Sequence, residues 1–241
     1  QVLFTGYYEP TYPGSLTPEQ GYPYPVYSLP DDMIEIDLSA FSKKYHGHKR
    51  LKARVDSENK KVLPYFSRAD INSIPEFGQR AEPIGYLKNR VDRFFLEIQG
   101  SGRMQLEDGR EVRVHYAGSN GNAYRSVGRY LINQGEILKE NMSMQAIREW
   151  LELNPDRMDE VLHHNESFVF FEIEPHGPKG SLGVKVTPMR SIATDAGLFP
   201  KGAACFIQTR LPRPAEELPY DDQPLAGWDK AAFFVMNQDT G

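Results

Sequence analysis

The sequence has a single cysteine, Cys205, among its 241 residues. That count excludes an internal disulfide and a zinc site built from several cysteines. No run of about 18 apolar residues occurs, so no segment reads as a membrane-spanning helix. A basic surplus is also missing, because 28 lysines and arginines stand against 33 aspartates and glutamates and leave a net charge of −5. Duplex-binding proteins usually carry a basic surplus, so we expect no nucleic-acid partner.

What the sequence does contain is typical of a globular chain. Hydrophobic residues make up 39% and aromatic residues 12%, which leaves little room for extensive disorder. The length predicts one large domain or two small ones. Predicted strands come first, helices follow, and strands return at the end, an order that argues against a doubly wound sheet. We expect strands at 94–99, 112–116, 168–171, 183–186, 205–208 and 231–236, and helices at 124–135, 143–151 and 155–162.

Three segments have biased compositions. Residues 10–30 interleave six prolines with four tyrosines, which predicts an extended linker or a surface loop. Residues 43–61 carry eight basic residues against two acidic ones, which indicates a solvated face or contact with an anionic partner. Residues 215–229 are acidic and contain prolines and a glycine, which predicts a hairpin loop.

Common catalytic and metal-binding patterns have little support. His46 and His48 could share one face of a strand as metal ligands, but they lie among lysines that would repel a cation. Neither HExxH nor GxSxG occurs, and the glycine-rich segment 177–183 lacks the ending of a phosphate loop. Cys205 stands in a predicted strand, where a buried thiol is the better interpretation than a nucleophile. We therefore expect no metal and no cofactor.

Two polar clusters are candidates for ligand binding. The first is Gln99-Gly100-Ser101-Gly102-Arg103, in which glycines would allow a ligand to approach the backbone. The second runs from Tyr116 to Ser126 and is rich in amides, hydroxyls and tyrosine. Sugars are bound by such neutral donors and acceptors beside a flat aromatic ring. A glycine and asparagine turn followed by an ordinary helix cap explains the second cluster equally well.

Two aspartates are candidates for acid chemistry. Asp239 ends an apolar strand, where burial could raise the pKa of its carboxyl group and hold a proton. Asp195 follows a short apolar segment in the same way. The alternative for both is a turn aspartate that accepts a hydrogen bond from its own backbone.

Several stretches together carry a family resemblance. They are Phe4–Pro10, Tyr65–Arg68, Ile98–Arg103, Tyr116–Arg129, Met142–Arg148, Asn165–Phe171 and Gln238–Gly241. With these motifs the chain resembles the membrane-bound lytic murein transglycosylase A family from end to end. The resemblance implies a mainly β fold with some helices: a double-psi β-barrel from residues 1–10 and 176–241, and an inserted β-rich domain at 11–175. The glycan would lie in a groove between them.

The resemblance also implies a reaction. The family cleaves the β-1,4 bond between N-acetylmuramic acid and N-acetylglucosamine of peptidoglycan and forms a 1,6-anhydromuramyl product. A single aspartate would act first as acid and then as base, whereas most glycosidases use two carboxylates. Intramolecular attack by the C6 hydroxyl can replace the second carboxylate because the hydroxyl is already held close to C1. Two alternatives stay open: a hydrolytic glycosidase on the same scaffold, and a non-catalytic peptidoglycan-binding protein.

Site residues follow from the matched motifs. The family's principal acid would fall beyond Gly241, so Asp239 and Asp195 are the acid candidates inside the chain, with Asp239 as helper, and we expect sequence to be missing at both ends. The implied location is the periplasm, with a lipid anchor on the outer membrane outside this chain. Glycan strands would be the partner, cell-wall synthesis proteins are open as further partners, and we expect a monomer. The implied substrate contacts are Tyr7, Tyr8, Gln99, Ser101, Arg103, Tyr116, Asn120, Tyr124, Arg125 and Ser126.

Overall fold

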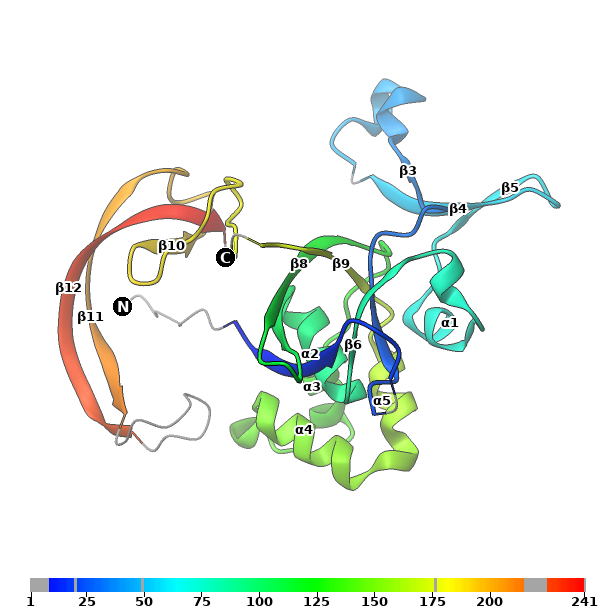
Figure 1. Ribbon diagram of the computed structural model, residues 1–241. Coiled ribbons are helices and arrows are strands. Elements are labelled where there is room, and N and C mark those ends of the chain that lie inside the picture. Colours follow the sequence, from blue (N-terminus) through cyan, green and yellow to red (C-terminus); the bar gives the residue numbers. More distant parts are fainter. Residues whose placement is uncertain (1–8, 20, 49, 176, 215–224, 241) are drawn as a thin grey trace. The chain divides into compact units, whose positions relative to one another are not determined.

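The computed structural model describes residues 9–240 apart from residues 20, 49, 176 and 215–224. The chain divides into two compact units. Residues 9–175 form the larger unit, and the described residues from 177 onward form the smaller unit. Strands predominate and helices are grouped in the larger unit (Figure 1), which confirms a mainly β fold with some helices.

A six-stranded sheet lies at the centre of the larger unit, in the order β2-β6-β1-β7-β8-β9. β1 and β7 run parallel, and the other neighbouring strands are antiparallel. The strands are β1 (Thr11–Ser15), β2 (Tyr24–Tyr27), β6 (Pro83–Leu87), β7 (Ser101–Gln105), β8 (Glu111–Ser119) and β9 (Val169–Ile173). The prediction of a linker at 10–30 is therefore wrong, because β1 and β2 are part of this sheet.

Helix α2 (Arg90–Gln99) occupies the segment that the sequence predicts as a strand. Asn89 caps its start by accepting a hydrogen bond from the Val91 N–H at 2.7 Å. Gly100 ends it with φ at 74°, a conformation that favours glycine. Buried residues stand at Val91, Phe94 and Phe95, which is helical spacing. The strand prediction is wrong because apolar and polar residues also alternate over part of this segment. The helix nevertheless buries a wide apolar face.

A hairpin turns at Asp108-Gly109, and its first strand is β7. β7 pairs with β8 from Ser101 opposite His115 to Gln105 opposite Glu111. The chain therefore runs directly from the end of α2 into the first strand of the hairpin. This connection places the cluster at Gln99 beside the strand that begins the second polar cluster.

The three later helices of the larger unit are close to their predicted positions. They are α3 (Val127–Asn133), α4 (Met144–Leu153) and α5 (Met158–His164). Ser126 caps α3 and Ser143 caps α4, each accepting a backbone hydrogen bond at 3.1 and 3.0 Å respectively. Pro155 begins a single 3₁₀ turn instead of an α-helix, so α5 starts three residues later. The remaining short helices are α1 (Arg68–Ser73), η1 (Leu38–Ala40), η2 (Lys43–Tyr45), η3 (Phe77–Gln79), η4 (Lys139–Asn141) and η5 (Pro155–Arg157).

The core of the larger unit has two clusters of buried side chains. The first joins the sheet to α2, α3, α4 and α5 and includes Leu96, Leu131, Leu151 and Leu162. The second lies around α1 and includes Phe77, Phe168 and Phe170. Consecutive residues Phe170 and Phe171 of β9 enter different clusters, because successive side chains of a strand point to opposite faces.

A separate three-stranded sheet lies in the larger unit, in the order β3-β4-β5. Its strands are β3 (Ile34–Ile36), β4 (Leu51–Asp56) and β5 (Lys61–Pro64). The basic segment 43–61 supplies β4, the first residue of β5 and the chain before and between them, and its lysines at 43, 44, 60 and 61 are exposed. Their exposure agrees both with a solvated face and with contact with an anionic partner.

The smaller unit contains a three-stranded sheet in the order β10-β12-β11. β10 (Ser191–Thr194) runs parallel to β12 (Leu225–Thr240), and β11 (Ala204–Pro214) runs antiparallel to it. The strands predicted at 205–208 and 231–236 are confirmed, and the second is part of β12, the central strand of the sheet. The segment 183–186 is not a strand, apart from an isolated bridge between Lys179 and Lys185. Of the loop predicted at 215–229, residues 215–224 lie outside the described residues and 225–229 belong to β12.

Among the described residues, no helix combines the length and the apolar character needed to cross a membrane.

Candidate functional site

The two polar clusters of the larger unit meet at the end of α2. The Gly100 carbonyl accepts a hydrogen bond from the Tyr116 N–H at 2.7 Å. Gln99 is exposed and its amide contacts the sulfur of Met144 at 3.2 Å. Tyr116 is 46% exposed on β8. The fold therefore brings an amide and a phenol to the same part of the surface from segments 17 residues apart.

The middle of the first cluster is not a place for a ligand to approach. Ser101 is only 4% exposed. A Cβ atom at Gly102 would lie 2.7 Å from Leu96 Cδ1 and 3.2 Å from the Pro10 carbonyl oxygen. The glycine is needed because helix α2 and the chain before β1 approach it closely. The sequence predicts that a ligand approaches the backbone at these glycines, but at Gly102 other parts of the protein occupy that space.

Arg103 belongs to a group of four charged side chains. Its guanidinium lies 3.6 Å from a Glu9 carboxylate oxygen and 3.3 Å from one of Glu111. Arg113 approaches the same two carboxylates at 3.7 and 3.8 Å. Glu9 is mostly buried, with 14% of its side chain exposed. These pairings fix the Arg103 side chain between β7, β8 and the chain entering β1.

Asn120 is a structural residue. It is 1% exposed, and its amide donates to the carbonyls of Phe66 and Glu166 at 2.8 and 2.9 Å. Its side-chain oxygen accepts from the N–H groups of Phe168 and Asn122 at 2.9 and 3.3 Å. All four hydrogen-bonding positions of the amide are therefore used. The Asn120 amide is therefore fully used within the protein, and its contact with a sugar stays a prediction.

The segment after Asn120 carries exposed and anchoring residues in alternation. Tyr124 is 60% exposed. The backbone N–H of Arg125 donates to the Asn165 side chain at 3.2 Å, and the Arg125 guanidinium pairs with Glu166 at 3.1 Å. Ser126 is the cap of α3, which is the structural alternative left open for it. Tyr124 and Arg125 are thus the large side chains that this segment exposes to solvent.

A buried arginine supports these loops and was assigned no role from the sequence. Arg68 is 2% exposed and donates to the Asn165 carbonyl at 2.9 Å. It also pairs with Glu97 of α2 at 2.7 Å, where both side chains are almost fully buried. Arg93 lies 3.6 Å from the same glutamate, and burial lowers the pKa of its guanidinium. The sequence signal for this supporting role was the family resemblance, because Tyr65–Arg68 and Asn165–Phe171 are among the stretches that carry it.

In the smaller unit, Asp239 and Asp195 lie near the ends of two neighbouring parallel strands. Ala193 is paired with Asp239 across β10 and β12. One oxygen of Asp239 accepts the Ser181 N–H at 2.9 Å. Asp195 is exposed and accepts the Gly197 N–H at 2.7 Å. Asp195 is thus a turn aspartate, whereas Asp239 is held by a loop from elsewhere in the chain.

The loop that holds Asp239 requires a glycine. A Cβ atom at Gly180 would lie 2.2 Å from the Gln238 carbonyl oxygen and 3.2 Å from Asp239 Cβ. The glycine-rich segment 177–183 therefore includes a turn that packs against the Asp239 motif. Sequence reasoning missed this role for Gly180 and Ser181, although the density of glycine in the segment was a signal.

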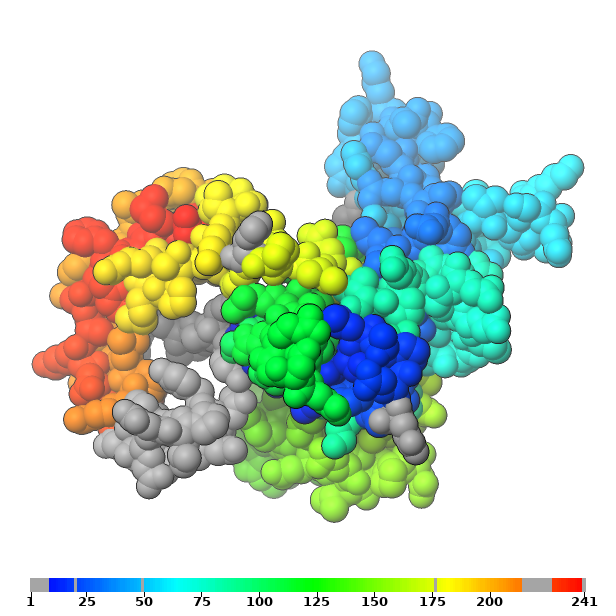
Figure 2. Space-filling model, in the orientation of Figure 1, coloured from blue at the N-terminus to red at the C-terminus, as the bar shows by residue number. Residues whose placement is uncertain are grey.

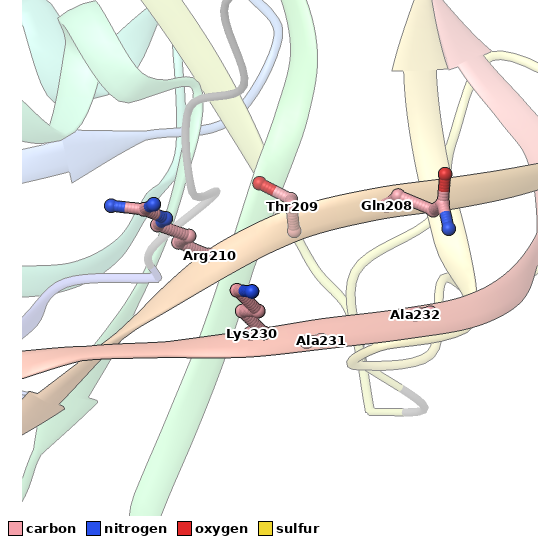
Figure 3. Close-up of a pocket in the computed structure, with 6 residues that line it drawn as sticks. All are labelled: Gln208, Thr209, Arg210, Lys230, Ala231 and Ala232. Atoms are coloured by element: carbon pink, nitrogen blue, oxygen red, sulfur yellow. The ribbon is translucent and has the colours of Figure 1, made fainter.

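A shallow hollow of about 410 Å³ lies on the β11–β12 ribbon (Figure 3). It is lined by Gln208, Thr209, Arg210, Lys230, Ala231 and Ala232. Its ionisable side chains are both basic, so it offers no carboxyl group for acid catalysis. We place the candidate chemistry at Asp239 instead of this hollow.

Two further expectations concern residues away from these segments. Tyr7 and Tyr8 lie outside the described residues. His46 and His48 are exposed, and the described part of the chain holds no group of three or more histidine, cysteine, aspartate or glutamate side chains placed to bind a metal.

Comparison with known proteins gives consistent matches. The family model described as the MltA specific insert domain matches residues 3–172. A membrane-bound lytic murein transglycosylase A from Escherichia coli K12 is 33% identical over 219 residues, covering 87% of this chain and 50% of the relative. One from Vibrio cholerae is 34% identical over 213 residues, with the same coverage. The chain thus spans about half the length of the curated relatives it matches.

Solved structures give the same result. A crystal structure of MltA from Neisseria gonorrhoeae has a TM-score of 0.78 at 27% identity, covering 98% of this chain and 62% of that one. E. coli MltA with bound chitohexaose has a TM-score of 0.70 at 29% identity, covering 100% of this chain and 61% of that one.

Proposed function

The chain belongs to the MltA family, and on that premise we propose that the whole protein is a peptidoglycan lytic transglycosylase. The observation that carries this proposal is a set of four exposed polar or aromatic side chains on segments anchored by buried ones. The set consists of Gln99, Tyr116, Tyr124 and Arg125. Asn120 and Arg68 hold those segments rigid, and a rigid set of amide, phenol and guanidinium groups is suited to a sugar polymer.

The proposed substrate is the glycan strand of peptidoglycan. The chitohexaose bound by E. coli MltA supports this choice, since it is a chain of β-1,4-linked N-acetylhexosamines. Tyr116 and Tyr124 would pack their rings on sugar faces, while Gln99 and Arg125 would hydrogen-bond to hydroxyl or acetamido groups. Tyr7 and Tyr8 stay predicted contacts. Arg103 is paired with Glu9, so it would contact the glycan as part of that charged group and not as a single side chain.

The proposed reaction uses no water. A carboxylic acid protonates the glycosidic oxygen between N-acetylmuramic acid and N-acetylglucosamine, and the bond to C1 breaks. The muramyl C6 hydroxyl attacks C1, and the resulting carboxylate removes its proton. A 1,6-anhydro ring forms, the carboxyl group regains its starting state, and the attack is intramolecular.

Within this chain we assign Asp239 a supporting role in that reaction. The Ser181 N–H donates to one carboxyl oxygen at 2.9 Å, which holds the Asp239 carboxyl group in place at the end of β12. Asp195 is committed to its own turn and is the weaker candidate. That the principal acid follows the Gln238–Gly241 motif stays a prediction, as does a double-psi β-barrel around β10, β11 and β12.

We also propose a periplasmic, membrane-associated location. Relatives from E. coli and Vibrio cholerae are named membrane-bound, and that property is extended here to the full-length protein. Attachment through a lipid would be the means of association.

The product mass tests the proposal. Full-length protein is incubated with purified sacculi, and muropeptides are analysed by mass spectrometry. We expect products lighter by one water than those of hydrolysis. Products of hydrolytic mass would show a glycosidase, and glycan binding without cleavage would show a binding protein; either result would overturn the proposal.

Variants then test the residues. Asp239→Asn should lower turnover and leave glycan binding intact. Gln99→Ala and Tyr124→Phe should each weaken chitooligosaccharide binding by about 1–2 kcal/mol. Gln134→Ala, an exposed amide at the end of α3, is the matched control and should bind as the unaltered protein does. If all variants bind the glycan equally, the four exposed residues are ordinary surface residues that do not contribute to binding.

A further inference from the structure

The three-stranded sheet β3-β4-β5 has two chemically different faces. Cross-strand pairs on one face join Ile34 to Ala53, Ile36 to Leu51, Val55 to Val62 and Ala53 to Pro64. Side chains alternate between faces along a strand, so this face consists of apolar residues alone. The opposite face carries Glu35 beside Lys52, Arg54 beside Leu63 and Asp56 beside Lys61.

The polar face is the one that packs against the rest of the larger unit. The Cβ of Lys52 would meet a Cβ at Gly121 at 2.7 Å. The Arg54 guanidinium lies over the Phe66 ring at 4.3 Å. The usual arrangement of an antiparallel sheet, with its apolar face inward, is therefore reversed here.

The apolar face is exposed in consequence. Leu51 is 49% exposed, Val55 55% and Val62 54%. Ala53, at the centre of the face, is buried. Figure 1 shows these strands projecting from the six-stranded sheet, and Figure 2 shows the same segments as protruding blue and cyan surface. Several exposed aliphatic side chains grouped on one sheet face mark an interaction surface.

The charge around this face indicates its partner. Lys43 and Lys44 lie in η2, between β3 and β4, and Lys60 lies in the turn between β4 and β5. Among the described residues none of these three forms an ion pair, and Glu58 is the acidic residue of that turn. A second copy of the chain would bring lysines against lysines, so self-association through this face is disfavoured. Aliphatic side chains bordered by lysines suit an anionic lipid surface.

We propose that the apolar face of β3-β4-β5, with Lys43, Lys44 and Lys60 on the segments that join its strands, binds peripherally to an anionic lipid bilayer. Leu51, Val55 and Val62 enter the headgroup region, and the lysines contact lipid phosphates. This contact is made by the polypeptide itself and needs no covalent lipid. It is independent of glycan cleavage, so the proposed enzymatic function can fail while this proposal holds.

Vesicle co-sedimentation tests the proposal. The 241-residue chain, free of any lipid modification, is mixed with vesicles of phosphatidylglycerol and phosphatidylethanolamine, or with phosphatidylcholine alone. We expect binding to the anionic vesicles that weakens as salt is raised. Equal binding to both vesicles, or none to either, would overturn the proposal. Concentration-dependent self-association without vesicle binding would also overturn it and point to a second copy.

Three variants locate the surface. Val55→Thr with Val62→Thr keeps the β-branched shape and should lower the partition coefficient at least about fivefold. Lys44→Glu with Lys60→Glu should lower it at least about tenfold. Leu153→Asp alters a residue that is 81% exposed at the end of α4 and should bind normally. Circular dichroism checks that each variant is folded. Unchanged binding in the first two variants, or an equal loss in the third, would contradict this location.

Discussion

The larger and smaller units place their apolar side chains differently. Both buried clusters lie in the larger unit. Among the described residues of the smaller unit, Ile207 and Val235 are the buried hydrophobic side chains. Phe206, Trp228, Phe234 and Met236 are exposed on the same ribbon. The comparison teaches that side-chain burial stabilises the larger unit, whereas the backbone pairing of β11 with β12 is the main described interaction of the smaller one.

Charged residues show the same contrast. The larger unit buries Arg68, Arg93 and Glu97 together. In the smaller unit, Arg213 and Asp229 pair at 3.5 Å with both side chains more than half exposed. A buried pair leaves an uncompensated charge when one partner is lost, but an exposed pair is replaced by water. Substitutions in the two units should therefore differ sharply in effect.

The largest expected effect comes from Arg68→Ala. It leaves Glu97 without its 2.7 Å partner and removes a donor from the Asn165 carbonyl, so unfolding should be easier by about 3–5 kcal/mol. Urea unfolding followed by circular dichroism measures this loss. Arg213→Ala, the control in the smaller unit, should change stability little. Similar losses from both substitutions would contradict the distinction between the units.

Aromatic truncation gives the second comparison. Phe171 is 1% exposed in β9, and Phe234 is 69% exposed in β12. Phe171→Ala opens a cavity and should cost about 3–5 kcal/mol. Phe234→Ala should cost within about 1 kcal/mol, although its ring lies 5.0 Å from that of Phe206. Thermal unfolding of both variants decides the point. A large loss at Phe234 would show that this face is covered in solution.

The sequence predicted the fold unevenly, and the errors have physical causes. The helices predicted at 124–135, 143–151 and 155–162 depend on local apolar spacing and were found close to those positions. Residues 94–99 were misread because apolar alternation and a wide helical face coincide over six residues. Residues 24–27 form strand β2 despite Pro25 because β2 lies at a sheet edge, where proline costs no ladder hydrogen bond on the outer side. Such positions depend on distant pairing, which local composition does not encode.

The sequence predicted the types of residue at the candidate site better than it predicted the role of each residue. Gln99, Tyr116, Tyr124 and Arg125 are exposed as a binding role requires. Asn120 and Ser126 carry the same polar chemistry but use it on the protein backbone. Nothing in the spacing separates a buried amide from an exposed one. The hydrogen bond from Ser181 to Asp239 joins residues 58 positions apart in the sequence. Local sequence patterns do not predict a contact over that separation.

Gly180→Ala tests whether the loop around Gly180 holds Asp239 in the smaller unit. The added methyl would meet the Gln238 carbonyl oxygen at 2.2 Å, so the loop must move and the Ser181 to Asp239 hydrogen bond should break. We expect a loss of about 1–3 kcal/mol, with faster hydrogen exchange at Ser181. Gly183→Ala, a change in the same loop where the Cβ meets nothing within 4 Å, separates this clash from backbone strain at φ 71°. An unchanged exchange rate at Ser181 in Gly180→Ala would show that the loop does not hold Asp239.

The smallest effect concerns pH and the larger unit alone, since the described residues of the smaller unit include no histidine. Burial, and then the charge of Arg90, lower the pKa of His163 from its usual value of 6.5. Asn72 contacts its Nε2 at 3.1 Å, as expected for a neutral ring that accepts a hydrogen bond. The unfolded chain binds the proton more readily, so the contribution of His163 is present above pH 6.5 and is lost as pH falls through the lower folded value. His163→Gln should therefore lose less stability than the unaltered chain between pH 7.5 and 5. Urea unfolding at several pH values measures the difference, and parallel pH profiles would mean that His163 titrates as it does in water.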